Sequence, residues 1–139
     1  MLMSYNAEII RGWPYDGALE RVEVIGASQT LQNGDWVTKN SDNSVSKSGA
    51  TASNAVGLVI EGNGDSGSAA YSGKAVVLWG NFLARIQNFD NTATYVPGAN
   101  LTVKNGVITL AGGSDPVIGF VLDVVAAGTT TTANLVIKK

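Results

Sequence analysis

Short apolar runs separated by glycine and other turn-forming residues restrict most strongly how this chain can fold. The runs cover residues 21–24, 36–38, 56–60, 75–79, 81–87, 117–125 and 135–137. None of them continues with the 3.6-residue period of an amphipathic helix, and 17 glycines interrupt the chain. Short runs of this kind, bounded by turn residues, are typical of β-strands. The sequence therefore predicts an all-β fold, either a barrel or a sandwich.

The clearest local signal is a hairpin over residues 101–110. Residues 101–104 and 107–110 are both strand-like, and only Asn105 and Gly106 separate them. Asn-Gly tolerates the positive φ angles that both central residues of a type I′ turn require. We therefore expect a tight hairpin, with Gly106 as a structural glycine.

An internal repeat is visible in the order of the segments. Three pairs of segments correspond, residues 34–39 with 98–104, 55–61 with 117–123, and 75–78 with 134–137. The sequence thus predicts a single β domain over 21–139 that contains pseudo-repeats at about 31–87 and 95–139. Gly57 and Gly119 hold matching positions inside strands of the two repeats, where glycine indicates a bulge or the close approach of another backbone.

Residues 1–20 differ from the rest and are interpreted as an extended N-terminal arm. The arm contains Arg11, Trp13, Pro14 and Tyr15. Arg, Trp and Tyr are the residue types that most often anchor protein interfaces. These four residues are therefore candidates for partner binding, although the segment could equally be a loop that covers one end of a barrel.

The composition excludes most common catalysts. The chain has no cysteine and no histidine, so it offers no thiolate, no imidazole base and no usual zinc ligand set. Charged residues make up 14%, the net charge is −2, and the nine basic residues form no stripe that would bind nucleic acid. No apolar run is long enough to span a membrane, and the first six residues lack the features of a secretion signal. We expect no cofactor, no metal, no nucleic-acid partner and no membrane partner.

Two motifs imitate chemistry in one stretch, residues 62–67. Gly62-Asn63-Gly64-Asp65-Ser66-Gly67 fits the dinucleotide fingerprint, but the residues after it are too broken by glycine to form the required helix. Gly64-Asp65-Ser66-Gly67 is similar to the nucleophile segment of serine proteases, whose serine needs an imidazole. A turn or surface loop is the expected structure. A weak cation site at Glu61 and Asp65 or at Asp42 is conceivable, but the oxygen ligands lack the spacing of a calcium loop.

The chain resembles the head decoration, or capsid cement, proteins of tailed bacteriophages, including the lambda type. The likeness covers most of residues 31–137 and runs through residues 45–49, 54–59, 68–73 and 80–85, then 116–123, 126–128 and 135–137. The resemblance implies a compact glycine-rich β-barrel or β-clip-like body with an extended arm. It also implies a homotrimer that is made in the host cytoplasm and sits on the outer surface of the virion, where it clamps the major capsid protein.

The leading functional hypothesis is therefore a virion structural protein, not an enzyme, that binds and cements an assembled capsid. A glycan-binding β module of a phage fibre or spike is an alternative, in which Trp36 or Trp79 would be an exposed stacking platform. Without that role, the two tryptophans are expected in the core or at a subunit contact. An enzyme that works through carboxylates alone is the third possibility.

Overall fold

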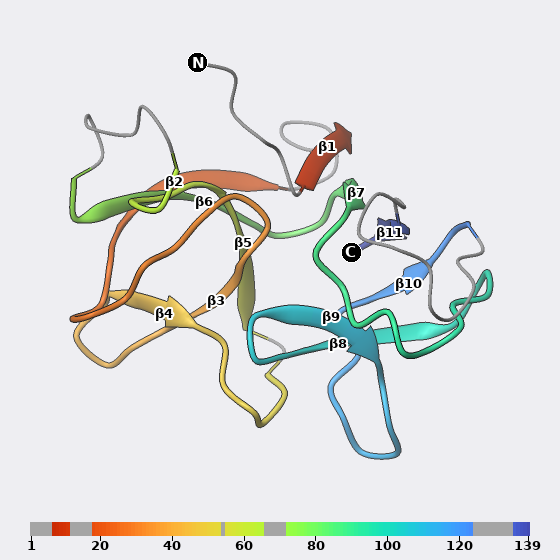
Figure 1. Ribbon diagram of the computed structural model, residues 1–139. Helices are drawn as coiled ribbons and strands as arrows, with labels where there is room; N and C mark the ends of the chain where they lie inside the picture. The colour runs from red at the N-terminus through yellow and green to blue at the C-terminus, as the bar shows by residue number, and fades with distance from the viewer. Residues whose placement is uncertain (1–6, 12–17, 54, 66–71, 124–134) are drawn as a thin grey trace.

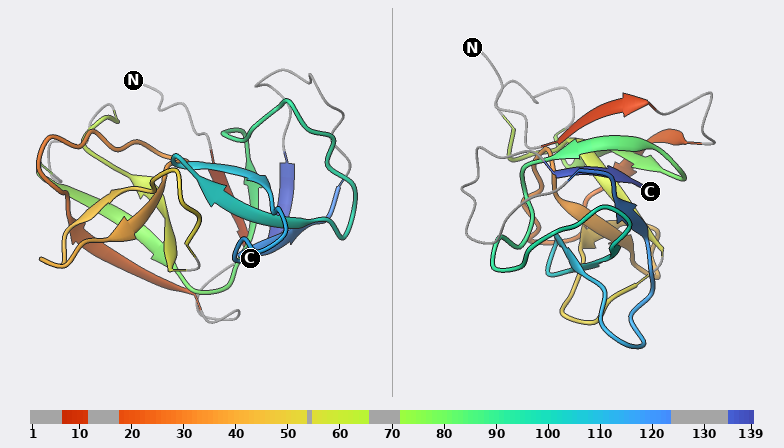
Figure 2. Two further views of the ribbon diagram at one scale, coloured as in Figure 1. Left: turned by 90° about the horizontal axis from the view of Figure 1, so that it is seen from below. Right: turned by 90° about the vertical axis from the view of Figure 1, so that its right-hand side faces the viewer.

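The computed structural model describes residues 7–11, 18–53, 55–65, 72–123 and 135–139. Within these residues the chain is all β, as the sequence predicts, with eleven strands in two antiparallel sheets (Figure 1). The described part contains no helix long and apolar enough to cross a membrane. Figure 2 shows the two sheets beside each other in one elongated body.

The first sheet has five strands, in the spatial order β2 (Leu19–Val24), β6 (Lys74–Trp79), β5 (Val56–Glu61), β3 (Trp36–Lys39) and β4 (Val45–Lys47). The second has six, in the order β1 (Ala7–Arg11), β7 (Leu83–Ile86), β11 (Leu135–Lys138), β10 (Gly119–Val121), β8 (Asn100–Lys104) and β9 (Val107–Leu110). Apart from β1, the two sheets repeat one order of strands. Strands β2 to β6 occupy the same relative places as β7 to β11.

The correspondence extends to the ends of the sheets. A single parallel bridge joins Ile25, just after β2, to Val45 in β4, and an equivalent bridge joins Phe89, after β7, to Ile108 in β9. Neither sheet closes further within the described residues. The structural halves cover 19–79 and 83–138, so β7, which lies within the predicted first repeat of about 31–87, belongs to the second sheet.

The hairpin of β8 and β9 has the predicted turn. Asn105 has φ of 53° and Gly106 has φ of 79°, and Lys104 pairs with Val107 across the turn. The tip of this hairpin reaches the first sheet: the Trp36 N–H donates to the Gly106 carbonyl at 3.2 Å, and the Gly106 N–H donates to Ser48 Oγ at 2.7 Å. The prediction of a type I′ turn is confirmed, and the turn also locks the two halves together.

One hydrophobic core extends across both sheets, and a smaller one lies within the first. The large core joins Trp36 and Leu58 of the first sheet to Ile86 and Leu101 of the second, and to Phe82 just before β7. The rings of Trp36 and Phe82 stack with centroids 6.1 Å apart. The smaller core consists of Leu31, Val37, Val45, Val59, Ala75 and Val77. Because the large core draws on both halves, they form one packed body.

Gly57 does not mark the bulge that the sequence indicates, but lies where a larger residue would collide with its neighbours. Its strand pairing with Val37 is regular, and the register shift of β5 falls further along, between Val59 and Glu61. A Cβ at Gly57 would lie 2.5 Å from Val77 Cγ1 and 2.9 Å from Trp79 Cε3. Gly57 is therefore not a bulge; it makes room for side chains of β6. Gly119 begins β10 and pairs with Leu101.

Candidate protein-interaction surface

Hydrogen bonds from both backbone and side chains hold the loop with the nucleotide-binding motif, residues 62–65, against the neighbouring loop at residues 31–33. The Asp65 carboxylate accepts hydrogen bonds from the Gly62 N–H at 2.8 Å and from the Asn33 N–H at 3.0 Å. The Gly64 N–H donates to the Leu31 carbonyl at 2.8 Å, and a Cβ at Gly62 would lie only 2.3 Å from that oxygen. Gly62 and Gly64 thus allow two backbones to approach, which gives them a folding role.

Three exposed or partly exposed aspartates cap turns in the same way. Asp42 accepts from Ser44 N–H and Oγ, Asp90 from Thr92 N–H and Oγ1, and Asp115 from the Gly112 N–H and Lys104 Nζ. Hydrogen bonds from Ser44 and Thr92 lower the pKa of Asp42 and Asp90, and the bond from Lys104 lowers that of Asp115. A lowered pKa favours the charged acceptor over the protonated acid. These three carboxylates therefore stabilise turns of the fold.

The most buried carboxylates are also engaged within the fold. Asp35 accepts from the Gln32 N–H at 3.0 Å and lies 3.7 Å from Lys47 Nζ, and burial raises its pKa. Glu23 pairs with Lys39 Nζ and lies 3.2 Å from Arg21 Nε. No group of three or more potential metal-ligating side chains occurs in the described ranges. The conceivable cation site at Glu61, Asp65 or Asp42 therefore gains no support from the geometry.

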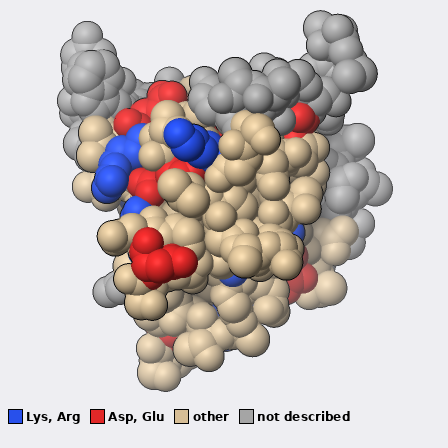
Figure 3. Space-filling model, turned by 90° about the vertical axis from the view of Figure 1, so that its left-hand side faces the viewer, with Lys and Arg blue, Asp and Glu red and all other residues tan. Residues whose placement is uncertain are grey.

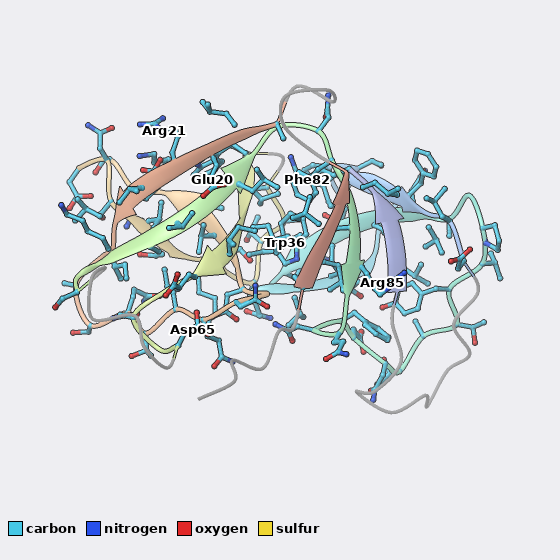
Figure 4. The ribbon with its side chains drawn as sticks, turned by 90° about the horizontal axis from the view of Figure 1, so that it is seen from above. Glu20, Arg21, Trp36, Asp65, Phe82 and Arg85 are labelled. Atoms are coloured by element: carbon cyan, nitrogen blue, oxygen red, sulfur yellow. The ribbon has the colours of Figure 1, made fainter. Side chains whose placement is uncertain are left out.

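The two strand tryptophans lie inside the fold to different extents. Trp36 is fully buried against Phe82, so it cannot be a stacking platform for a glycan, and its expected place in the core is confirmed (Figure 4). Trp79 is partly buried and packs over Gly57 and the small core. The glycan-binding alternative loses one of its two candidate residues.

The predicted arm is tied into the body at two places. Residues 7–11 form β1, which pairs antiparallel with β7, and the Ala7 N–H donates to Asn33 Oδ1 at 2.8 Å. Beyond the segment 12–17, Ala18 is buried and β2 begins at Leu19. Arg11 is the last residue of β1, opposite Leu83. Trp13, Pro14 and Tyr15 lie outside the described residues, between these two fixed points.

Large apolar side chains are exposed in two regions. Around β10 they are Val96, Val117, Phe120 and Leu122, and on β2 they are Leu19, Val22 and Val24. Exposed apolar groups that gather on a surface mark protein-interaction sites. On the face that the first sheet presents, acidic and basic side chains lie intermingled, without a patch of one sign (Figure 3).

The exposure of β2 reverses what its sequence pattern suggests. Alternating Arg21-Val22-Glu23-Val24 predicts a half-buried strand with its valines inward. In the structure Glu23 is 3% exposed, whereas Val22 and Val24 are 57% and 56% exposed. The pattern predicts the strand but not which of its faces is covered. The covered face carries Glu23, which pairs with Lys39, a residue distant in sequence.

No protein-family model matches the chain, and no curated protein matches it significantly. The exposed apolar regions are the observation in the described residues that bears on its function.

Proposed function

We propose that this chain is a structural protein that binds the outer surface of an assembled phage capsid and stabilises it, without enzymatic activity. The observation that carries the proposal is the exposure of Val96, Val117, Phe120 and Leu122 around β10. The carboxylates of Asp65 and Asp35, by contrast, accept hydrogen bonds from backbone N–H groups and so stabilise loops of the fold. The partner is the major capsid protein, and the compact body is the barrel or β-clip-like body of the decoration proteins. The parallel bridges at Ile25 and Phe89, which draw each sheet around, support that shape.

A surface of this composition suits docking onto a large protein assembly. Charged residues make up only 14% of the chain, so little charge has to lose its hydration on contact. Single contacts can be weak, because many identical sites on a lattice hold an oligomer by avidity. Arg11, Trp13, Pro14 and Tyr15 complete the proposed capsid contact, since Arg11 ends β1 and the other three follow it in the sequence between β1 and β2.

The experiment is co-sedimentation with undecorated shells of the major capsid protein from the same genome. Deleting residues 1–16 would be a poor probe, because it also removes β1 and uncovers the edge of β7. We would instead compare Trp13→Ala/Tyr15→Ala and Phe120→Ser/Leu122→Ser with wild type. Val24→Ser is the matched control, an exposed apolar residue on another strand.

We expect the wild type and the control to pellet with the shells, and each double variant to bind at least several-fold more weakly. Circular dichroism shows whether the variants remain folded. A wild-type chain that stays in the supernatant contradicts the capsid proposal. Two folded double variants that bind like wild type contradict the assignment of these residues.

A further inference from the structure

Strand β2 is an open edge where its counterpart in the other half is covered. In the second sheet, β7 lies between β1 and β11. In the first sheet, the corresponding strand β2 pairs with β6 along its whole length, and on its other side the one pairing among the described residues is the bridge from Ile25, just past the strand, to Val45 of β4 (Figure 4). The repeat of strand order thus leaves one position empty, on the outer side of β2.

The side chains of β2 combine charges with exposed apolar residues. Natural edge strands carry charges that discourage pairing with another chain, and β2 has three of them, Glu20, Arg21 and Glu23. Here Val22 and Val24 are more than half exposed. Leu19, at the start of the strand, is 51% exposed. Because side chains alternate along a strand, Val22 and Val24 share one face of β2, and that face is exposed.

We propose that a second copy of this chain pairs with β2 along its own β2, antiparallel and centred on Val22. The two first sheets would then continue into each other across a two-fold axis. Such an interface is isologous, so each residue pair occurs twice and the assembly closes at two copies.

The charges of β2 select this register among the antiparallel ones. With Val22 opposite Val22, Arg21 lies opposite Glu23 of the other copy on both sides of the axis. A pairing centred on Arg21 or on Glu23 sets like charges directly opposite, and one centred between Arg21 and Val22 sets Glu20 opposite Glu23. Opposite-charge pairs across a ladder are stabilising and like-charge pairs are destabilising.

The geometry of the ion pairs fits the same arrangement. Glu23 is buried and held by Lys39, and its Oε1 lies 3.2 Å from Nε of Arg21 in the same chain without accepting a hydrogen bond. The side chain of Arg21 is 53% exposed, at the outer edge of the sheet (Figure 4). An Arg21 from the second copy would therefore approach Glu23 as a further donor.

β2 has six residues, and the area buried by pairing two such strands is small compared with the roughly 1,200 Å² at the lower end of standard interfaces. We therefore expect a concentration-dependent dimer, not a permanent one. It is distinct from the three-fold association that the resemblance to decoration proteins implies, which would need another surface.

The first test is the mass in solution as a function of concentration, by sedimentation equilibrium. We expect a monomer–dimer equilibrium that approaches twice the chain mass of 14.3 kDa. Val22→Lys should leave a monomer at concentrations where the wild type is dimeric. Val117→Lys, a matched exposed valine near β10, should leave the dimer intact.

The second test reads the register. The chain has no cysteine, so single cysteines can be introduced without a background. In a glutathione buffer, Val22→Cys should form a disulfide-linked dimer, because opposite Cα atoms in an antiparallel pair lie about 4.5–5.5 Å apart. Val24→Cys alone should not, whereas a mixture of Val24→Cys with Glu20→Cys should.

A monomer at all concentrations with no cross-link from Val22→Cys overturns the proposal, as does a Val24→Cys chain that cross-links as fast as Val22→Cys. A trimer that Val22→Lys leaves unchanged also overturns it. These outcomes do not depend on whether the chain binds shells, so a failure here and a failure of the capsid proposal are distinguishable.

Discussion

The backbone N–H of Trp36, at the start of β3, donates a hydrogen bond to the carbonyl of Gly106 at the tip of the β8–β9 hairpin. Residues seventy positions apart are thus joined at the point where the two halves meet. Trp36 also stacks on Phe82. The same residue therefore connects the first sheet to the second half through both its backbone and its ring.

Replacing Gly106 with alanine should destabilise the protein by about 1–3 kcal/mol, because the residue has positive φ and its new Cβ would meet Lys47 Cγ at 2.4 Å. Urea unfolding measures the change. Gly98→Ala shares the positive φ but has open space, so it isolates the backbone strain. Gly113→Ala, with neither feature, should be close to neutral. Equal effects at Gly106 and Gly98 would show that the contact with Lys47 costs nothing.

Gly57→Ala should also destabilise the fold, by roughly 1–3 kcal/mol, since its Cβ would overlap Val77 and Trp79. The double variant Gly57→Ala/Val77→Ala removes the closest of these contacts. We expect it to be more stable than the sum of the two single effects predicts, as measured in a double-mutant cycle. If the two single effects on the free energy of unfolding add exactly, the overlap of the new Cβ with Val77 does not explain the loss of stability in Gly57→Ala.

Ionisation of the buried Asp35 should lower the free energy of unfolding as the pH rises. Burial raises its folded pKa above the ordinary 3.8, so its contribution to stability is complete below pH 3.8 and is lost as the pH rises through the folded pKa. Asp35→Asn keeps an acceptor for the Gln32 N–H but does not titrate. Relative to wild type, its free energy of unfolding should increase between about pH 3.5 and pH 7. A difference that stays constant over this range would contradict the assignment.

Tyr95 should titrate well above the ordinary tyrosine pKa of 10.0. Burial, together with the charge of Asp90, raises its pKa to about 12, and its hydroxyl donates to the Asp90 carbonyl. In an ultraviolet titration we expect a tyrosine ionisation near pH 12 that Tyr95→Phe removes. Because the raised pKa makes stability fall as the pH rises from 10 towards 12, Tyr95→Phe should reduce that alkaline loss. At neutral pH it should cost about 1–2 kcal/mol for the missing hydrogen bond.

The sequence predicts the parts of this fold that local chemistry determines. The Asn105-Gly106 turn is an example, because its two residues tolerate positive φ without help from the rest of the chain. Strand β1 is not predicted, since five residues without clear alternation become a strand only by pairing with β7, more than seventy positions away. The buried side of β2 is misjudged for a similar reason: Lys39 and the small core determine it. The candidate anchors Trp13, Pro14 and Tyr15 stay a prediction.

The capsid proposal is tested most directly by calorimetry of undecorated shells of the major capsid protein from the same genome, with and without this chain. Saturating amounts of the chain should raise the temperature at which the shells dissociate, and the chain should remain bound at a fixed ratio to capsid subunits. Shells that dissociate at an unchanged temperature, with the chain left free in solution, would contradict it.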